Sequence, residues 1–245
     1  MAEIIKILFL AANPSDTSRL MVGEEMREID ARLLAASYRD SFELVTGPAV
    51  RPTDLQQLLL RHRPHIVHFS GHGTKKAEIV LQNDAGESAP VSPKALTSLF
   101  KVLKNNVRIV VLNSCFSGPQ SKGIVEAIDF AIGMKSAVFD ASAVAFSAAF
   151  YQGLAFGESV RTAFDLGCNQ IELSGLKGAE TPTLVVRKGA RDADTLINAP
   201  GTGLPGQAAV GGGPTGGGGN RSVSIGGNAS DSIIVTGDRN TVKKR

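Results

Sequence analysis

The first three quarters of the sequence alternate short apolar runs with longer amphipathic stretches. The runs at residues 4–10 and 108–113 hold few polar side chains, as is typical of strands buried on both faces of a sheet. Between such runs, apolar residues recur at spacings of three and four, as Ile29 and Leu33 do in a helix predicted over residues 19–37. Because parallel strands need crossover connections, this alternation predicts an α/β fold with a mostly parallel central sheet.

The remaining predicted elements complete this alternation. Further strands are predicted at residues 42–45, 65–70, 78–82, 130–134 and 183–187, and further helices at 53–59, 93–103, 120–129, 140–154 and 159–171. Ligands of such sheets bind beyond the carboxyl ends of the strands. We therefore expect the functional residues in the loops at residues 11–18, 71–76, 114–120 and 135–140.

Composition divides the chain into three parts. Many of its 27 glycines lie between Gly201 and Gly227. We predict one globular domain over residues 1–190, a Gly/Pro-rich flexible linker over 191–220, and a short β-hairpin or β-solenoid-like tail over 221–245. Because about three strands or repeats are normally needed for stability, the tail is expected to pair with an activating protein partner.

Charge and residue usage exclude several kinds of partner. With 26 basic and 23 acidic residues, 5% aromatic residues and no tryptophan, the chain predicts no nucleic-acid surface. No apolar run is long enough for a membrane span, and no signal peptide is recognised. Two cysteines and four histidines without zinc-ligand spacing predict no metal and no cofactor. A reducing, cytoplasmic location is the simplest expectation.

A histidine and a cysteine follow two predicted neighbouring strands. His72 and Cys115 each come directly after an apolar run, within small residues that let a substrate approach closely. A cysteine nucleophile reacts as the thiolate and needs a nearby base, which His72 can supply. The backbone N–H groups of Gly73 and Cys115 are candidates for an oxyanion hole. This pattern predicts thiol peptidase chemistry.

The same two segments carry a family resemblance. His-Phe-Ser-Gly-His-Gly at residues 68–73 and Val-Leu-Asn-Ser-Cys at residues 111–115 resemble the paired motifs of caspases, separases, gingipains and clostripain. Residues 1–190 resemble the CHAT domain of that group. The resemblance implies a caspase-like three-layer sandwich, a catalytic role for His72 and a nucleophilic one for Cys115. It also implies that the histidine mainly protonates the leaving amine.

Other candidate residues have ordinary alternative explanations. Asp140 follows a strand where this group builds the pocket for the residue before the cleaved bond, and its carboxylate would pair with a substrate Lys or Arg. It is equally suited to cap a helix beginning at residue 141, and we favour the cap. Ser114, Asn13 and Asp16 are further candidates for substrate contacts, although the last two are common turn residues. Taken alone, Cys115 is equally compatible with a buried core residue and with a nucleophile.

Two functions follow from these observations. The first is a cysteine endopeptidase that cleaves a protein or peptide substrate through a thioester acyl-enzyme, in regulated proteolysis such as bacterial defence or cell-death signalling. The second is a CHAT-like scaffold or adaptor that is recruited through its C-terminal tail. The presence of both His72 and Cys115 favours the enzyme.

Overall fold

The computed structural model describes residues 4–191 and 195–196. The described residues belong to one compact unit, Met1–Pro200. The predicted tail over residues 221–245 and nearly all of the predicted linker therefore lie outside the described residues.

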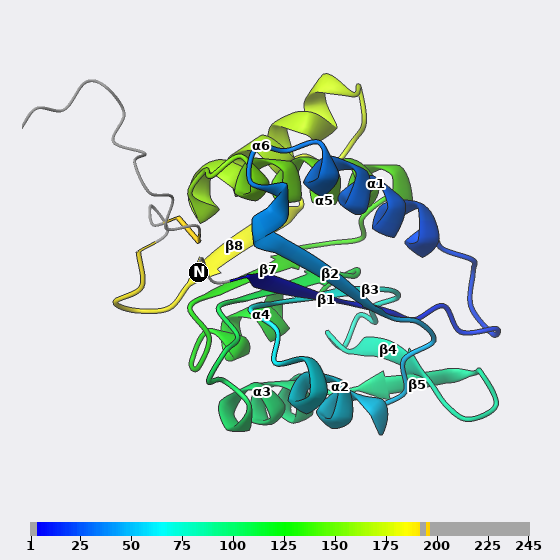
Figure 1. The fold of residues 1–245 in the computed structure, drawn as a ribbon. Coiled ribbons are helices and arrows are strands. Elements are labelled where there is room, and N and C mark those ends of the chain that lie inside the picture. The colour runs from blue at the N-terminus through cyan, green and yellow to red at the C-terminus, as the bar shows by residue number, and fades with distance from the viewer. Residues whose placement is uncertain (1–3, 192–194, 197–245) are drawn as a thin grey trace, which may run out of the picture. The chain divides into compact units, whose positions relative to one another are not determined.

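A six-stranded sheet with the order β2-β1-β3-β6-β7-β8 forms the centre of the domain (Figure 1). Its strands are β1 (Ile5–Ala11), β2 (Phe42–Gly47), β3 (Ile66–Ser70), β6 (Ile109–Asn113), β7 (Phe130–Met134) and β8 (Pro182–Val186). The pairs from β2 to β7 are parallel, and only the edge strand β8 is antiparallel to its neighbour. A separate hairpin of β4 (Ile79–Gln82) and β5 (Ser88–Val91) follows β3. The predicted α/β fold with a mostly parallel sheet is confirmed.

Helices cover both faces of the sheet. One layer contains α1 (Val22–Leu34), α5 (Asp140–Ala155) and α6 (Val160–Leu173), and the other contains α2 (Asp54–His62), α3 (Pro93–Val102) and α4 (Gly118–Ile124) (Figure 1). A short 3₁₀ turn, Arg39–Ser41, precedes β2. Among the described residues, no helix is long and apolar enough to cross a membrane.

Alternation along the strands decides which side chains meet each helical layer. In β1, Ile7 and Phe9 pack toward α1, α5 and α6, whereas Leu8 and Leu10 pack toward the other layer. The same parity in β6 places Val111 with the first group. Asn113, two residues later, therefore faces α1 and α5, as do His68 and Ser70 of β3.

Two predicted boundaries differ from the structure for local reasons. The first helix begins at Val22 instead of residue 19, because the preceding segment is folded back by hydrogen bonds between Asn13 and Leu20. At the start of α5 the N-cap is Phe139, with Asp140 as the first helical residue and no side-chain cap. The favoured reading of Asp140 as the N-cap is therefore wrong, because its carboxylate accepts a hydrogen bond from the backbone N–H of Met21 instead.

Candidate active site

The loops that follow β3 and β6 meet at the carboxyl edge of the sheet. Ser70 of β3 is paired with Asn113 of β6, so His72 and Cys115 each lie two residues beyond the same pair. The next residue, Gly73, packs directly against the backbone of Cys115. A Cβ atom on Gly73 would lie 2.0 Å from the Cys115 carbonyl oxygen and 3.0 Å from its nitrogen. The structure thus brings together the two residues that the sequence singled out.

His72 is held through both its backbone and its ring. Its carbonyl accepts a hydrogen bond of 2.9 Å from the N–H of Val80 in β4. Its Nε2 lies 2.7 Å from the carbonyl oxygen of Ser18. A carbonyl can only accept, so Nε2 carries the proton in this arrangement, and Nδ1 remains as the nitrogen that can take up and release one.

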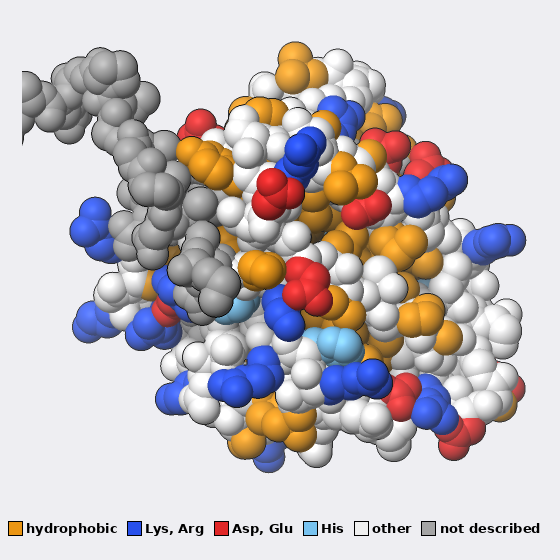
Figure 2. All heavy atoms as spheres, viewed as in Figure 1, with side chains coloured by type: hydrophobic (Ala, Val, Ile, Leu, Met, Phe, Trp, Pro, Cys, Tyr) orange, Lys and Arg blue, Asp and Glu red, His pale blue; other side chains and the backbone are white. Residues whose placement is uncertain are grey.

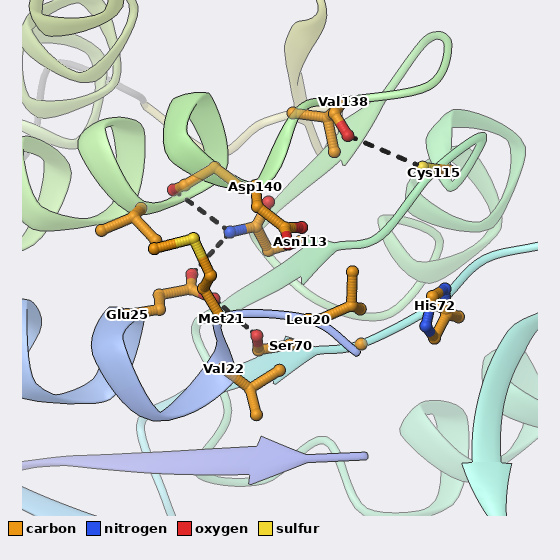
Figure 3. A pocket seen from close by; sticks show the side chains of 13 residues that line it. Leu20, Met21, Val22, Glu25, Ser70, His72, Asn113, Cys115, Val138 and Asp140 are labelled. Carbon is orange, nitrogen blue, oxygen red and sulfur yellow. Dashed lines mark hydrogen bonds between the residues drawn. The ribbon is translucent and has the colours of Figure 1, made fainter. Parts of the chain in front are cut away.

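Cys115 begins a loop that is tied to the neighbouring strand. The following residue, Phe116, has a left-handed backbone with a φ of 58°, and its N–H donates to the Ser136 carbonyl at 3.2 Å. The Ser117 hydroxyl accepts a hydrogen bond from the N–H of Met134 at 2.9 Å. These bonds fix the direction in which the loop leaves β6. The Cys115 thiol is half-buried, and Sγ lies 4.0 Å from the Val138 carbonyl oxygen (Figure 3).

Two backbone N–H groups beside the thiol are uncommitted. Gly73 forms a bridge with Ile79 in which the hydrogen bonds run from Thr74 and Val80, so the Gly73 N–H is left out of that pairing. Within the part of the chain that the structure describes, neither this group nor the N–H of Cys115 donates a hydrogen bond. Both groups are therefore free to donate to a bound acceptor.

A small pocket lies next to His72 and Cys115. Its volume is about 40 Å³. Its lining comes from the start of α1, the ends of β3 and β6, and the start of α5 (Figure 3). The polar side chains in the lining are Glu25, Ser70, His72, Asn113, Cys115 and Asp140, and the apolar walls include Leu20, Met21, Val22, Val138 and Val144.

Glu25 is the centre of a buried polar cluster at this pocket. Only 3% of the residue is exposed. One carboxylate oxygen accepts a hydrogen bond from Asn113 Nδ2 at 2.5 Å, and the other accepts from Ser70 Oγ at 2.5 Å (Figure 3). The first oxygen also accepts from Ser147 Oγ at 2.6 Å. His68 Nε2 contacts the first oxygen at 3.0 Å. Three elements thus supply donors to one carboxylate.

These partners keep Glu25 ionised. Burial alone raises the pKa of the Glu25 carboxyl, but the neighbouring His68 ring and the hydrogen bonds from Ser147 and Ser70 outweigh burial and leave the pKa below its ordinary value. Behind His68, Nδ1 lies 3.1 Å from the Tyr151 hydroxyl. Burial and the charge of Glu25 raise the pKa of Tyr151 well above its ordinary value, so this hydroxyl stays neutral.

Asp140 supplies a second carboxylate to the same pocket. Burial raises its pKa above the ordinary value, and the charge of Glu25 raises it further, while the Met21 N–H and the nearby His72 oppose both effects. The Asn113 side-chain oxygen is buried without a hydrogen-bond partner among the described residues. The pocket therefore presents two carboxylates and one unpaired carbonyl oxygen, all of them acceptors.

The other three predicted substrate contacts do not line this pocket. Ser114 is buried, and its hydroxyl has no partner among the described residues. Asn13 exchanges two hydrogen bonds with Leu20, of 3.2 and 3.3 Å, and so shapes the loop that carries Ser18. Asp16 accepts from the N–H and hydroxyl of Ser88 at 2.9 and 2.8 Å.

The second cysteine has a different environment. Cys168 lies in α6 and packs against the core. Burial raises the pKa of its thiol to about 11, with contributions from Asp165 and Glu172. Within the described residues, no group of three or more His, Cys, Asp and Glu side chains could hold a metal ion.

From the sequence we predict neither the Glu25 cluster nor the contact between the Ser18 carbonyl and His72. Glu25 stands four residues before Ile29, on the face of the helix that is otherwise apolar, and an acidic residue there is a readable signal. Asn113 and His68 likewise interrupt apolar runs. A backbone carbonyl such as that of Ser18 leaves no signal in side-chain types.

Comparison with known proteins shows which family the chain resembles. The model of the family described as "CHAT domain" matches residues 6–166. A "Roc-COR-CHAT protease" from an unknown prokaryotic organism is 29% identical over 156 residues, which are 61% of this chain and 15% of that protein. A "probable protease" of Gillisia limnaea is 27% identical over 150 residues, which are 60% of this chain and 26% of that protein. The chain therefore spans only a minor part of the length of these relatives.

Solved structures agree on the fold. A secreted C11 cysteine protease from Bacteroides thetaiotaomicron superimposes with a TM-score of 0.54 at 9% sequence identity, over 75% of this chain and 66% of that one. The caspase-like α/β sandwich predicted from the sequence is confirmed by this likeness. On the match of its residues 6–166, the chain belongs to the CHAT domain family.

Proposed function

We propose that this chain is a cysteine endopeptidase in which Cys115 is the nucleophile and His72 the proton carrier. The observation that carries the proposal is the meeting of the two loops, with His72 and Cys115 two residues beyond a paired Ser70 and Asn113. The peptidase names of the family relatives support the same activity.

The reaction can be written with these groups. The Cys115 thiol passes its proton to Nδ1 of His72 and Sγ attacks the peptide carbonyl carbon, while the N–H groups of Gly73 and Cys115 stabilise the negative oxygen. Protonated Nδ1 of His72 passes its proton to the leaving amine as the C–N bond breaks, and a thioester remains. Water then adds to the thioester carbon as its proton passes to Nδ1 of His72. The C–S bond breaks, the carboxylic acid product leaves, and the proton returns to Sγ. The Ser18 carbonyl keeps the ring oriented throughout.

The pocket chemistry supports a basic residue before the cleaved bond. Glu25, Asp140 and the unpaired oxygen of Asn113 offer acceptors and negative charge. A Lys or Arg side chain supplies donors and the opposite charge. An acidic side chain in this pocket would face two carboxylates, and an apolar one would bring no donor to the Asn113 oxygen.

The substrate in this proposal is a protein in a reducing, cytoplasmic compartment, cleaved in a regulated process such as defence or programmed death. Residues 221–245 serve to recruit an activating partner. This part rests on the predicted tail and on the analogy with the CHAT family, whose relatives extend well beyond the matched region.

Labelling with peptide acyloxymethyl ketones tests the activity. The wild type is compared with Cys115→Ala, His72→Ala and the control Cys168→Ala, using probes with Lys, Leu or Asp before the reactive group. We expect labelling at Cys115 only, lost in Cys115→Ala, reduced at least tenfold in His72→Ala and unchanged in Cys168→Ala. The Lys probe should react fastest, and Asp140→Asn should reduce that preference. If no probe labels Cys115, the scaffold function replaces the peptidase.

A further inference from the structure

A long groove crosses the helical layer formed by α1, α5 and α6. Its floor is the outer face of α5, where Ala141, Ala145 and Ala149 leave the helix backbone close to the surface. One wall is α1 with Glu24 and Glu28, and the other is the end of α6. This part of the groove encloses about 220 Å³.

The groove continues along α5 into a more apolar section. That section encloses about 430 Å³ and shares Ala149, Gln152 and Gln170 with the first. Three large apolar side chains in its lining are exposed, Phe156 by 45%, Leu166 by 43% and Leu173 by 72%. Figure 2 shows exposed apolar side chains among charged ones over this helical layer. Contiguous exposed apolar side chains of this size usually mark a binding surface.

The charge of the lining is negative. Glu24, Glu28 and Glu158 face the groove, and the one cation in the lining of either section is Arg32. Arg32 lies 4.0 Å from Glu28 and donates to Gln152 at 3.2 Å, so its charge is already matched. The groove is thus apolar along its floor and acidic along the α1 side. A complementary partner has an apolar face with basic residues along one edge.

We propose that this groove binds an amphipathic α-helix of a protein partner. Small side chains on α5 let a helix approach closely, and helices pack side by side at about 8–10 Å. The bound helix would present apolar residues at i, i+3 or i+4, and i+7 to the floor. Its Lys or Arg residues would lie against Glu24 and Glu28.

The groove adjoins the pocket beside Cys115. Met21 and Val144 line both the groove and the pocket beside Cys115. The N–H of Met21 also donates to Asp140. A helix in the groove would therefore contact the wall of the pocket, so that its presence and the shape of the pocket are linked.

Selection from a displayed library of 20-residue helical peptides tests the proposal on the full-length chain. Affinities of the enriched peptides are measured by fluorescence anisotropy for the wild type, Ala145→Arg, Leu173→Lys and the double variant Glu24→Lys/Glu28→Lys. The matched control is Leu60→Arg, which changes an exposed leucine on α2 in the opposite layer. Circular dichroism shows whether each variant keeps its fold, and the exposed Leu173 provides a substitution with little risk to folding.

We expect the selection to enrich basic amphipathic peptides. Their affinity should fall at least tenfold in Ala145→Arg and Leu173→Lys, and should also fall in Glu24→Lys/Glu28→Lys and in high salt. Their affinity for Leu60→Arg should equal that for the wild type. Equal binding to all variants, or selected peptides without basic residues, would overturn the proposal. So would self-association of the chain that Ala145→Arg abolishes, because the occupant would then be a second copy. The bound peptide should also change the rate of Cys115 labelling, and this arm alone rests on the peptidase proposal.

Discussion

Glu25 shows how much of this site depends on a single buried charge. Its two oxygens accept hydrogen bonds from residues on β3, β6 and α5, and it also contacts His68. An ionised carboxylate at this depth is stable only while those donors surround it. Removing the charge should therefore disturb the fold as well as the pocket.

We expect Glu25→Gln to lower the free energy of unfolding by about 3 kcal/mol at pH 7, because three buried donors lose the charged acceptor that they share. The folded pKa of Glu25 lies below its ordinary value of 4.5, so the charge stabilises the fold above that pH, and this contribution disappears as the pH falls further. The difference between wild type and variant should accordingly shrink below pH 4.5. Urea unfolding at several pH values measures it.

Glu28→Gln is the control for this prediction. Glu28 is on the same helix, half exposed, and 4.0 Å from Arg32. Its substitution should change stability by less than about 0.5 kcal/mol at any pH. A Glu25 variant that behaves like this control would show that the cluster does not hold a charge.

Gly73 permits the close approach of the two loops, and this leads to a second residue-scale prediction. Gly73→Ala places a Cβ atom 2.0 Å from the Cys115 carbonyl oxygen, so one loop must move. A shift of about 1 Å in the catalytic groups costs about 100-fold in rate, which is the reduction expected in Cys115 labelling. Gly23→Ala in α1, where nothing lies within 4 Å, should instead stabilise the chain by about 0.5–1 kcal/mol without affecting labelling.

The sequence predicts the residues that carry chemistry better than those that support them. His72, Gly73 and Cys115 are recognisable because a small-residue motif directly follows an apolar run. The Glu25 cluster draws Ser147 from a position 122 residues away, and no local pattern records such a contact. The pattern predicts a cap at Asp140 because an aspartate before a helix usually caps it, whereas here the backbone N–H of Met21, just before α1, donates to its carboxylate.

At the scale of elements, the strands buried on both faces were predicted to within about two residues. Unbroken apolar runs specify them without reference to neighbours. The ends of α1 and α4 were placed less well. For α1, the hydrogen bonds between Asn13 and Leu20 fold the preceding loop and move the start of the helix to Val22.

The loop between β1 and α1 should control the orientation of His72. Asn13 closes this loop on Leu20, and the loop carries the Ser18 carbonyl that holds the ring. We expect Asn13→Ala to lower kcat/KM for peptide hydrolysis about tenfold, since roughly 1–2 kcal/mol of hydrogen bonding is lost. Ser15 lies on the same loop as Asn13 and donates an exposed hydrogen bond to the Gly86 carbonyl. Ser15→Ala removes this bond and should leave kcat/KM unchanged. Equal effects of both substitutions would argue against the orienting role.

The Asp129 carboxylate links the end of the antiparallel edge strand β8 to the start of β6. Asp129 accepts hydrogen bonds from Arg108, before β6, and from Arg187, which follows β8. Asp129→Asn should raise hydrogen-exchange rates in residues 182–186 about tenfold, because it removes the charge that both arginines share. Glu126→Gln, which breaks a pair with the exposed Lys101, should leave these rates unaltered. Unchanged exchange in Asp129→Asn would assign the attachment of β8 to packing alone.

At the scale of the whole molecule, the two hydrophobic cores lie on either side of the sheet and are built from residues between Ile5 and Leu196. A chain that ends at Pro200, the last residue of the compact unit, should therefore fold with a thermal midpoint within about 2 °C of the full chain. Differential scanning calorimetry measures this midpoint. A large drop on truncation would mean that residues 201–245 contribute to the stability of the domain.

The two cysteine thiols differ in environment, and this difference allows reactive thiols to be counted by alkylation. With a pKa of about 11, the Cys168 thiol is ionised in only about one molecule in 10,000 at pH 7. A mild alkylating reagent at that pH should consume about one equivalent per competent chain. Because an unfolded chain exposes both thiols and consumes up to two equivalents, the end point of such a titration would report the folded fraction of a preparation, without a substrate having to be known.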